Sequence, residues 1–159
     1  MSRNRLIVLA LIAIAAIIVI VVVMNNRSGA NPIVTERRET MKGMGGKAQT
    51  INDFVEKGTG DAATVATAAQ DIQATAAKIP DLFPAGTSMN DNVGETGAKP
   101  EIWANFDAFK AAAAKMGELA GALAVAAQGG DKQAITDAFG ALGKDGCGGC
   151  HSQFRQKLN

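Results

Sequence analysis

A C-x-x-C-H stretch, Cys147-Gly148-Gly149-Cys150-His151, lies close to the C-terminus of this 159-residue chain. Two thiols three positions apart, followed at once by an imidazole, suit the covalent attachment of haem. Each cysteine sulfur can add to one vinyl group of the porphyrin, and the histidine then lies under the iron as its axial ligand. On a helix these three side chains stand at i, i+3 and i+4, so they leave the same face. The stretch therefore predicts one covalently attached haem c.

Other interpretations of this stretch fit the residues less well. A closed structural zinc site needs four nitrogen or sulfur ligands, whereas the chain contains two cysteines and one histidine. A thioredoxin-like redox pair normally follows a β-strand, and no strand pattern precedes Cys147. A structural disulfide between Cys147 and Cys150 stays open as an alternative, because the N-terminal residues point to an oxidising compartment.

Length and composition favour one helical domain behind an apolar N-terminal segment. Alanine and glycine dominate, tyrosine is absent and only 4% of residues are aromatic, which suits closely packed helices better than a β-sandwich. From residue 31 onward, 13 basic and 15 acidic side chains leave a net charge of about −2. The sequence has no basic run and we expect no basic face, so nucleic acid is not an expected partner.

Residues 1–30 predict a cytoplasmic N-terminus and a transmembrane signal-anchor. Leu6–Met24 is an unbroken apolar run of 19 residues that follows Arg3 and Arg5. A run of this length can cross a bilayer as a helix, and the arginines favour a cytoplasmic N-terminus. The domain would then be periplasmic and anchored to the inner membrane. A cleaved secretory signal is the alternative, because Ser28-Gly29-Ala30 offers small residues to a peptidase, although the apolar run is longer than most signal peptides have.

Residues 31–159 contain four segments in which apolar residues recur mostly at spacings of three and four, as in the helices of a bundle. The segments span residues 31–58, 62–79, 101–128 and 131–158. The residues expected to face inward are Val34, Arg37, Met41, Met44, Ala48, Ile51, Val55, Ala62, Val65, Ala69, Ile72, Ala76, Ile79, Ile102, Phe106, Phe109, Ala113, Met116, Ala120, Leu123, Ala127, Ile135, Phe139, Leu142, Cys147, Cys150, Phe154 and Leu158. Two short connections and one long loop, residues 80–99, predict an all-α, antiparallel four-helix bundle with its cofactor in the core and an N-terminal transmembrane helix.

Three features of these segments point to a bound group. Arg37 is a permanent cation on an apolar stripe, where it either snorkels to solvent or meets an anion such as a haem propionate. The long loop is unusual in a compact domain, and we expect Phe83 to pack against the cofactor edge. The fourth segment contains several glycines that each cost about 1 kcal/mol relative to alanine, a cost that a flat macrocycle close to the backbone would offset. These glycines are Gly140, Gly143, Gly146, Gly148 and Gly149.

The chain resembles cytochrome c′, the class II c-type cytochromes, over essentially all of residues 31–159. The likeness is carried by Arg37, Met41 and Gly45-Gly46, by Leu82-Phe83-Pro84-Ala85-Gly86-Thr87 with Ala98-Lys99-Pro100-Glu101-Ile102-Trp103, and by Phe139-Gly140 through the C-x-x-C-H stretch to Arg155. The resemblance implies a periplasmic four-helix bundle that is often a homodimer through its first two helices. It also implies a high-spin haem whose iron is held by one histidine and whose opposite face is closed by an apolar side chain.

Carried over to this chain, the resemblance implies a role for each site residue. Cys147 and Cys150 would form the thioethers and His151 would be the proximal ligand. Met41 would cover the distal face, and Phe83 would lie near the haem edge. Two arginines complete the set, Arg37 at a propionate and Arg155 on the proximal side. The predicted anchor is a departure, since most members are soluble after signal removal.

The chain has a single histidine, His151, and the predicted haem uses it as the axial ligand. No distal histidine is left to act as the acid and base of peroxide cleavage, so we do not expect an enzyme. A distal side without a hydrogen-bond donor favours NO and CO over dioxygen, which predicts a five-coordinate, gas-binding haem. The alternative is a six-coordinate, low-spin electron carrier in which Met41 binds the iron, as in a subset of the family, and which serves redox partner proteins. Met44 lies on the same stripe, and the spacing does not decide between the two.

Overall fold

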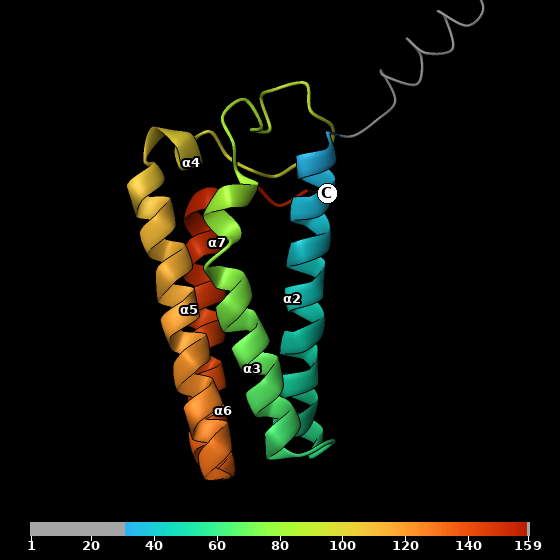
Figure 1. Cartoon of the computed structure of the whole chain (residues 1–159), viewed down its shortest axis with the longest axis vertical. Coiled ribbons are helices and arrows are strands. Elements are labelled where there is room, and N and C mark those ends of the chain that lie inside the picture. Colours follow the sequence, from blue (N-terminus) through green and yellow to red (C-terminus); the bar gives the residue numbers. More distant parts are fainter. Residues whose placement is uncertain (1–30, 159) are drawn as a thin grey trace, which may run out of the picture. The chain divides into compact units, whose positions relative to one another are not determined.

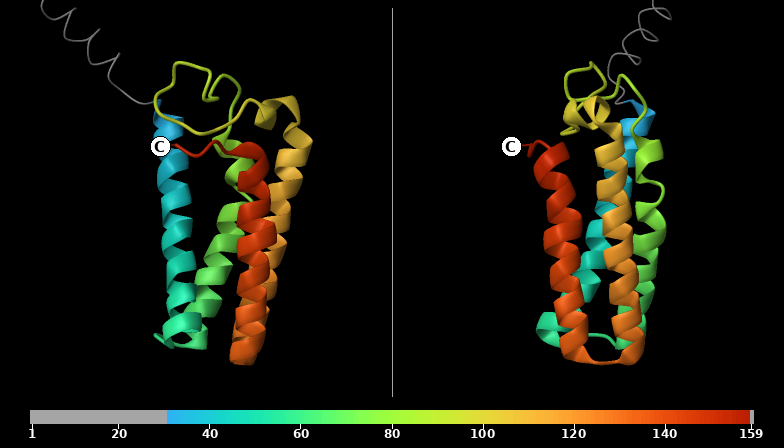
Figure 2. Two further views of the ribbon diagram at one scale, coloured as in Figure 1. Left: turned by 180° about the vertical axis from the view of Figure 1, so that it is seen from behind. Right: turned by 90° about the vertical axis from the view of Figure 1, so that its left-hand side faces the viewer.

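The fold is a bundle of four helices that run alternately up and down (Figures 1 and 2). A computed structural model of the chain describes residues 31–158, and the transmembrane helix predicted within residues 1–30 lies outside them. Among the described helices, none is both long and apolar enough to cross a bilayer. The prediction of an all-α, antiparallel four-helix bundle is confirmed for the described domain.

The first helix begins and ends where its capping residues predict, whereas the second ends early. Helix α2 spans Pro32–Lys57 and follows Asn31, whose side chain accepts a hydrogen bond from the Ile33 N–H at 3.1 Å. It stops at Gly58, which has a φ of 68° that glycine adopts without strain. Helix α3 spans Ala62–Ala76, and a 3-10 turn, η1 (Ile79–Leu82), continues the chain from it. The α-helix is thus shorter than the predicted segment, since a proline at position 80 disfavours the helical conformation just before it.

The third segment is not the single helix that its apolar pattern predicts. It consists of a short helix, α4 (Glu101–Ala104), and a long one, α5 (Phe106–Gly129). Asn105 separates them with φ −140° and ψ 65°, and its side-chain oxygen accepts a hydrogen bond from the Ala108 N–H at 3.3 Å. The asparagine therefore ends one helix and caps the next, a role that the apolar spacing does not report.

The fourth segment combines two kinds of helix. It runs from α6 (Lys132–Ala141) through a π-helical segment, η2 (Leu142–Gly148), into α7 (Gly149–Phe154). The helix ends at Phe154, four residues before the predicted end, because the chain turns there to pair with the end of the long loop. The Lys99 N–H donates to the Phe154 carbonyl at 3.1 Å, and the Gln156 N–H donates to the Gly97 carbonyl at 2.8 Å.

The core follows the predicted inward faces closely. Helix α3 packs along α5 and α2, and α5 packs against α6 and η2. Fully buried positions on the predicted stripes include Val34, Ile51, Val65, Ile72, Ile102, Phe109, Leu123, Ile135 and Leu142. Burying an aliphatic or aromatic side chain of this size contributes about 1.5–3 kcal/mol, so these stripes hold the bundle together. Leu158 is the exception, since it lies beyond the last helix and is 44% exposed.

Candidate haem site

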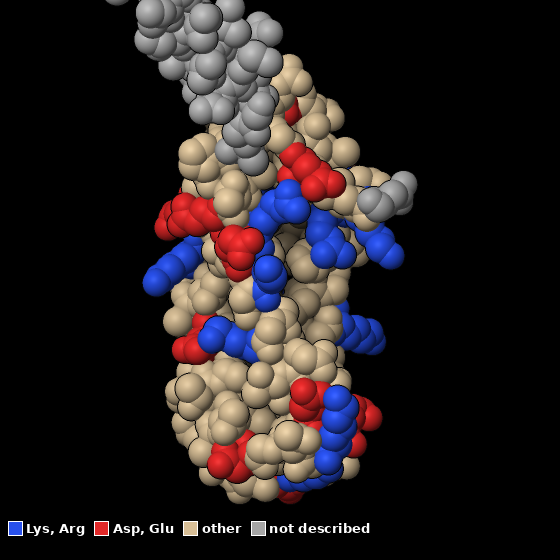
Figure 3. Space-filling view, turned by 90° about the vertical axis from the view of Figure 1, so that its right-hand side faces the viewer, with Lys and Arg blue, Asp and Glu red and all other residues tan. Residues whose placement is uncertain are grey.

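A cavity of about 850 Å³ lies in the domain, within the size range of sites for organic cofactors. Figure 3 shows the face of the molecule on which a hollow is surrounded by basic side chains. Most of the lining comes from α2, the 80–99 loop, α5 and the η2–α7 segment, and α3, η1, α4 and α6 each contribute a residue. Its apolar lining includes Met41, Met44, Ile72, Ile79, Phe83, Ile102, Phe109, Met116, Phe139, Leu142 and Phe154.

The two cysteines and the histidine of the C-x-x-C-H stretch all line this cavity, as their helical spacing predicts. Cys147 lies in η2, and Cys150 and His151 lie on α7. Both thiols are free and half-buried, and burial raises their pKa values, so they are protonated at neutral pH. Burial, together with the nearby charge of Arg155, lowers the pKa of His151. The site therefore offers two thiols and a neutral imidazole, the forms that suit thioether formation and iron ligation.

The π-helical segment η2 is the feature of the site that sequence reasoning missed. π-helical turns are rare and concentrate at functional sites. Its glycines are of two kinds: a Cβ on Gly146 would come within 3.1 Å of the Leu142 side chain and 3.4 Å of the Met116 backbone, whereas one on Gly143 would meet nothing within 4 Å. Gly146 therefore allows η2 to pack closely on α5, while Gly143 lines the cavity. The prediction that bound haem offsets the glycine cost remains a prediction for Gly143, and close helix packing explains Gly146.

Arg37 is buried, with only 4% of its surface exposed, so it does not snorkel to solvent. Its Nε donates to the Leu82 carbonyl at 3.1 Å, and its Nη1 donates to the Thr87 carbonyl and the Thr96 hydroxyl at 3.2 and 3.3 Å. Its Nη2 donates to the Thr87 hydroxyl at 2.8 Å, and its guanidinium carbon lies 4.0 Å from the centre of the Phe83 ring. Burial lowers the pKa of Arg37 to about 10, which leaves it charged at neutral pH.

These contacts give Arg37 a role in holding the long loop, which the sequence did not indicate. Four of its five donors are engaged by neutral acceptors of that loop. The side chain also lines the cavity, and one Nη2 hydrogen has no acceptor among these contacts. The guanidinium can thus fix the loop and still offer one donor to an anionic group.

Phe83 lines the cavity and is buried, as expected for a residue at the edge of a bound group. Its ring meets Phe109 edge to face, with 4.7 Å between ring centres, and lies 6.3 Å from the Trp103 ring. The Trp103 indole N–H donates to the Phe83 and Pro84 carbonyls at 3.0 and 3.1 Å. Aromatic contacts and two hydrogen bonds therefore fix both the ring and the backbone of Phe83.

Met41 and Arg155 also line the cavity, Met41 from α2 and Arg155 from the end of α7. Met41 is partly buried on α2, one turn after Arg37, and packs against the core. Arg155 follows α7 in an extended conformation, with φ −119° and ψ 129°, and pairs in a β-bridge with Ala98. It therefore lies just past the helix end, where its charge still acts on His151. All seven residues that the sequence identifies for the site border one cavity.

The donor set and the cavity fit a covalently bound haem. Two protonated thiols and a neutral imidazole border a largely apolar cavity, whereas a metal ion bound by side chains alone would need more ligands. Within the part of the chain that the structure describes, no group of three or more His, Cys, Asp or Glu residues is arranged to hold a metal ion. Fold and site together define a class of protein, the four-helix bundles that carry c-type haem.

Comparison with known proteins agrees with this class and narrows it. Residues 32–155 match the family model described as cytochrome c′, and the chain belongs to this family. Cytochrome c-556 of Agrobacterium tumefaciens (strain B2A) is 40% identical over 128 residues, which cover 78% of this chain and 97% of the relative. The cofactor of the chain is accordingly one covalently attached haem c.

Two solved structures of the same family bear on ligands and assembly. A cytochrome c′ with ligand-controlled dimer dissociation is 30% identical and superposes with a TM-score of 0.72, over 81% of this chain and 98% of that one. A mutant of cytochrome c prime from Alcaligenes xylosoxidans, solved as its nitric oxide complex, is 26% identical with a TM-score of 0.68, over 82% and 100% of the two chains. Dimer dissociation and nitric oxide binding are thus described for those two proteins.

Proposed function

We propose that this protein is an exported haem protein whose iron is held by His151 alone among the side chains, is five-coordinate and high-spin, and binds NO and CO. One observation carries the proposal: the single histidine of the chain borders a largely apolar cavity on the same helical face as two free thiols. The haem would supply an iron with one open position for a small gas. The nitric oxide complex of the Alcaligenes xylosoxidans relative supports this chemistry.

The residues of this chain have distinct roles in the proposal. Cys147 and Cys150 would fix the cofactor covalently, and burial keeps the His151 imidazole neutral for ligation. Arg37 would offer its remaining N–H to a propionate while it holds the loop. Phe83 would close the haem edge, since its ring is fixed and lines the cavity. We assign no enzymatic activity, because the only histidine is used as a ligand and no second one can act as acid and base.

An electron carrier with Met41 as sixth ligand is the second candidate function. The Met41 side chain lines the same cavity as His151, which is the observation that favours it. Ligation by methionine would give a low-spin iron with a raised potential. In the first proposal the same side chain covers the distal face without binding the iron.

The optical spectrum of the purified ferric protein distinguishes the two functions. A high-spin spectrum, with CO binding to the ferrous form and NO binding, is the expected result. A low-spin spectrum with methionine ligation would overturn the gas-binding proposal in favour of electron transfer. Absence of a haemochrome in alkaline pyridine, from protein matured with the c-type assembly machinery, would contradict both.

Replacing Met41 with alanine tests whether it acts as a steric gate. We expect Met41→Ala to bind CO faster than wild type by about tenfold or more, because removing the side chain lowers the barrier to the open iron position, and tenfold corresponds to about 1.4 kcal/mol. Met89→Ala is the matched control, since Met89 is 40% exposed and does not line the cavity. Equal on-rates in the two variants, measured by flash photolysis, would show that Met41 is not the gate.

We also propose that the domain is periplasmic and held at the inner membrane by residues 1–30. The family's periplasmic c-type cytochromes and the two thiols reserved for haem support export. N-terminal sequencing of the mature protein checks the anchor. Recovery of a chain that begins near residue 31 would show that the segment is a cleaved signal.

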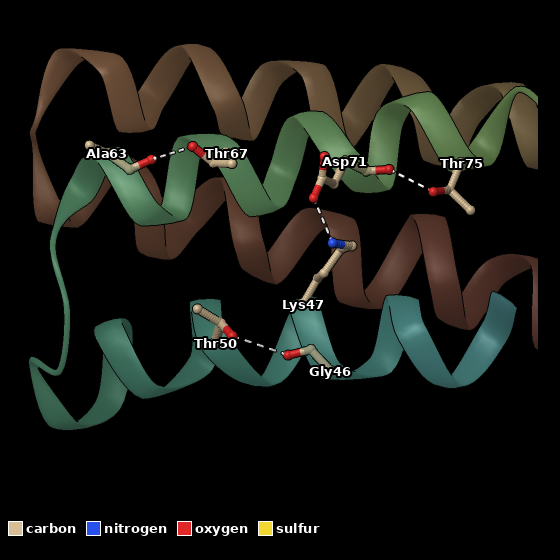
Figure 4. Close-up of polar contacts among 7 residues, drawn as sticks. All are labelled: Gly46, Lys47, Thr50, Ala63, Thr67, Asp71 and Thr75. Atoms are coloured by element: carbon tan, nitrogen blue, oxygen red, sulfur yellow. Dashed lines mark hydrogen bonds and ion pairs between the residues drawn. The ribbon is translucent and has the colours of Figure 1, made fainter. Parts of the chain in front are cut away.

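A homodimer through α2 and α3 is the proposed assembly. On these helices the hydroxyls of Thr50, Thr67 and Thr75 bond carbonyls of their own helices, and Lys47 pairs with Asp71 across them (Figure 4). These three hydroxyls would keep their hydrogen-bond partners if a second copy covered this surface. Sedimentation equilibrium should give twice the monomer mass, and a monomer at micromolar concentrations would contradict the proposal.

A further inference from the structure

The mouth of the cavity carries a basic rim made by residues distant in sequence. Arg38 and Lys42 lie one turn apart on α2, and Arg155 and Lys157 lie in the segment after α7. We name these four residues the basic rim; Figure 3 shows Lys and Arg side chains around the hollow on this face. The expectation that no basic face would form is therefore wrong, because α2 and the C-terminal segment meet only in the folded bundle.

The rim reverses the charge of the domain locally. Together with the buried Arg37, the rim gives the cavity lining five basic residues against two acidic ones, whereas the remainder of residues 31–159 carries eight basic and thirteen acidic residues. A local excess of positive charge attracts an anionic partner to the cavity mouth and orients the two proteins as they approach each other. The two acidic residues, Glu39 and Glu95, interrupt the rim, and Glu95 pairs with Arg38 at 3.1 Å.

The rim also contains an apolar residue, as transient protein interfaces do. Leu158 is 44% exposed and lines the cavity directly after Lys157 in the chain. A small apolar contact within a charged ring suits the short-lived complexes of redox proteins, which bury less than about 1,200 Å². A rim of mixed sign fits a patterned protein surface better than a uniformly anionic one such as a lipid headgroup layer.

We propose that the basic rim is the docking surface for an acidic redox protein that exchanges electrons with the haem through the cavity mouth. The inference rests on the proposed haem site but not on its gas-binding function. One electron passes from the reduced cofactor of the partner to ferric iron, which becomes ferrous, and no covalent bond forms or breaks. Steering by the rim would bring the partner's acidic face to the mouth of the cavity that the haem would occupy.

Reduced flavodoxin, a small acidic flavoprotein, is the probe that tests this surface. Its rate of reduction of the full-length, haem-loaded ferric protein is measured by stopped flow at low ionic strength. Lys42→Glu/Lys157→Glu changes the rim, and Lys115→Glu/Lys132→Glu changes the net charge equally at two exposed positions that do not line the cavity. We expect the rim variant to react at least tenfold more slowly than wild type, and the control variant to lose less than threefold.

Salt dependence gives a second readout. The wild-type rate should fall steeply as the ionic strength rises toward 0.5 M, and the rate of the rim variant should change little. Equal losses in the two variants would show that only net charge matters and would overturn the proposal, as would an unchanged rate in the rim variant. The ferric spectrum and CO binding, recorded on the same samples, test the proposed function separately, so a low-spin iron would leave the docking result intact.

Discussion

Arg37→Met should destabilise the domain by about 2–3 kcal/mol, because it removes the donor that holds the long loop to α2. The substitution leaves the Leu82 and Thr87 carbonyls without their guanidinium donor, whereas the Thr96 hydroxyl still accepts from the Ala98 N–H at 3.2 Å. Each orphaned buried carbonyl costs about 1–3 kcal/mol. Removing the buried cation regains part of this free energy, because the charged guanidinium is itself costly to bury. That cost is also why burial lowers the pKa of Arg37 to about 10.

The measurement is thermal unfolding of the haem-loaded, full-length protein, followed by far-ultraviolet circular dichroism. A loss of 2–3 kcal/mol should lower the midpoint temperature by about 10 °C in a domain of this size. Arg38→Met is the matched control at the next position. Arg38 makes one ion pair, with Glu95, and both side chains are more than half exposed, so its loss should cost less than about 1 kcal/mol.

Equal stability of the two arginine variants would refute the role of Arg37 in holding the loop. A double-mutant cycle with Thr87→Val sharpens the test, because the Thr87 hydroxyl accepts the Nη2 hydrogen bond of Arg37. We expect a coupling energy of about 1 kcal/mol between the two substitutions. Strictly additive losses would show that Arg37 stabilises the protein by a route that bypasses this contact.

Three further outcomes follow from the structure. Gly146→Ala should destabilise the protein by about 1–3 kcal/mol, because its Cβ would meet Leu142 at 3.1 Å, whereas Gly140→Ala should stabilise it by up to about 1 kcal/mol, as thermal unfolding would show. Deleting Asp145 should leave circular dichroism helical but turn the cysteines away from the cavity by roughly 100°, so the pyridine haemochrome should be lost. The pKa of Asp91 is lowered by the hydrogen bonds that it accepts from Ser88. The stability that these bonds contribute is present above pH 3.8 and is lost as the pH falls below it. Asp91→Asn should therefore reduce the difference in the free energy of unfolding between pH 5 and pH 3, measured by urea titration.

The bundle and its inward faces could be predicted because a helical stripe is a local property. Spacings of three and four place Ile51, Ile72 and Leu123 on buried faces whatever the neighbours are, and all three are buried. The break at Asn105 could not be found in the same way, since the apolar spacing continues through it. The Asn105 side chain ends α4 and caps α5, and a capping role of this kind cannot be read from the spacing of apolar residues.

In the candidate site, too, the features set by local helical spacing could be predicted, whereas those that depend on residues distant in sequence could not. The spacing of the C-x-x-C-H stretch predicts that its thiols and imidazole share a face, and all three line one cavity. The partners of Arg37 lie 45 to 59 residues away and include backbone carbonyls, which every residue carries. Sequence therefore indicated that Arg37 needs a partner but not which one. The basic rim was missed for the same reason, since its members come from the two ends of the domain.

The π-helical segment left a trace in the sequence that spacing analysis can use. On the predicted inward face of the fourth segment, successive positions are three or four residues apart, except that Cys147 follows Leu142 by five. An α-helix advances about 100° per residue, so a step of five would rotate Cys147 away from the face that Leu142 occupies. One residue inserted in a π-turn absorbs that rotation, and η2 spans these two positions. Leu142 is thereby buried against α5 while the thiols still reach the cavity, so a five-residue step in a stripe of threes and fours is itself a signal of such a turn.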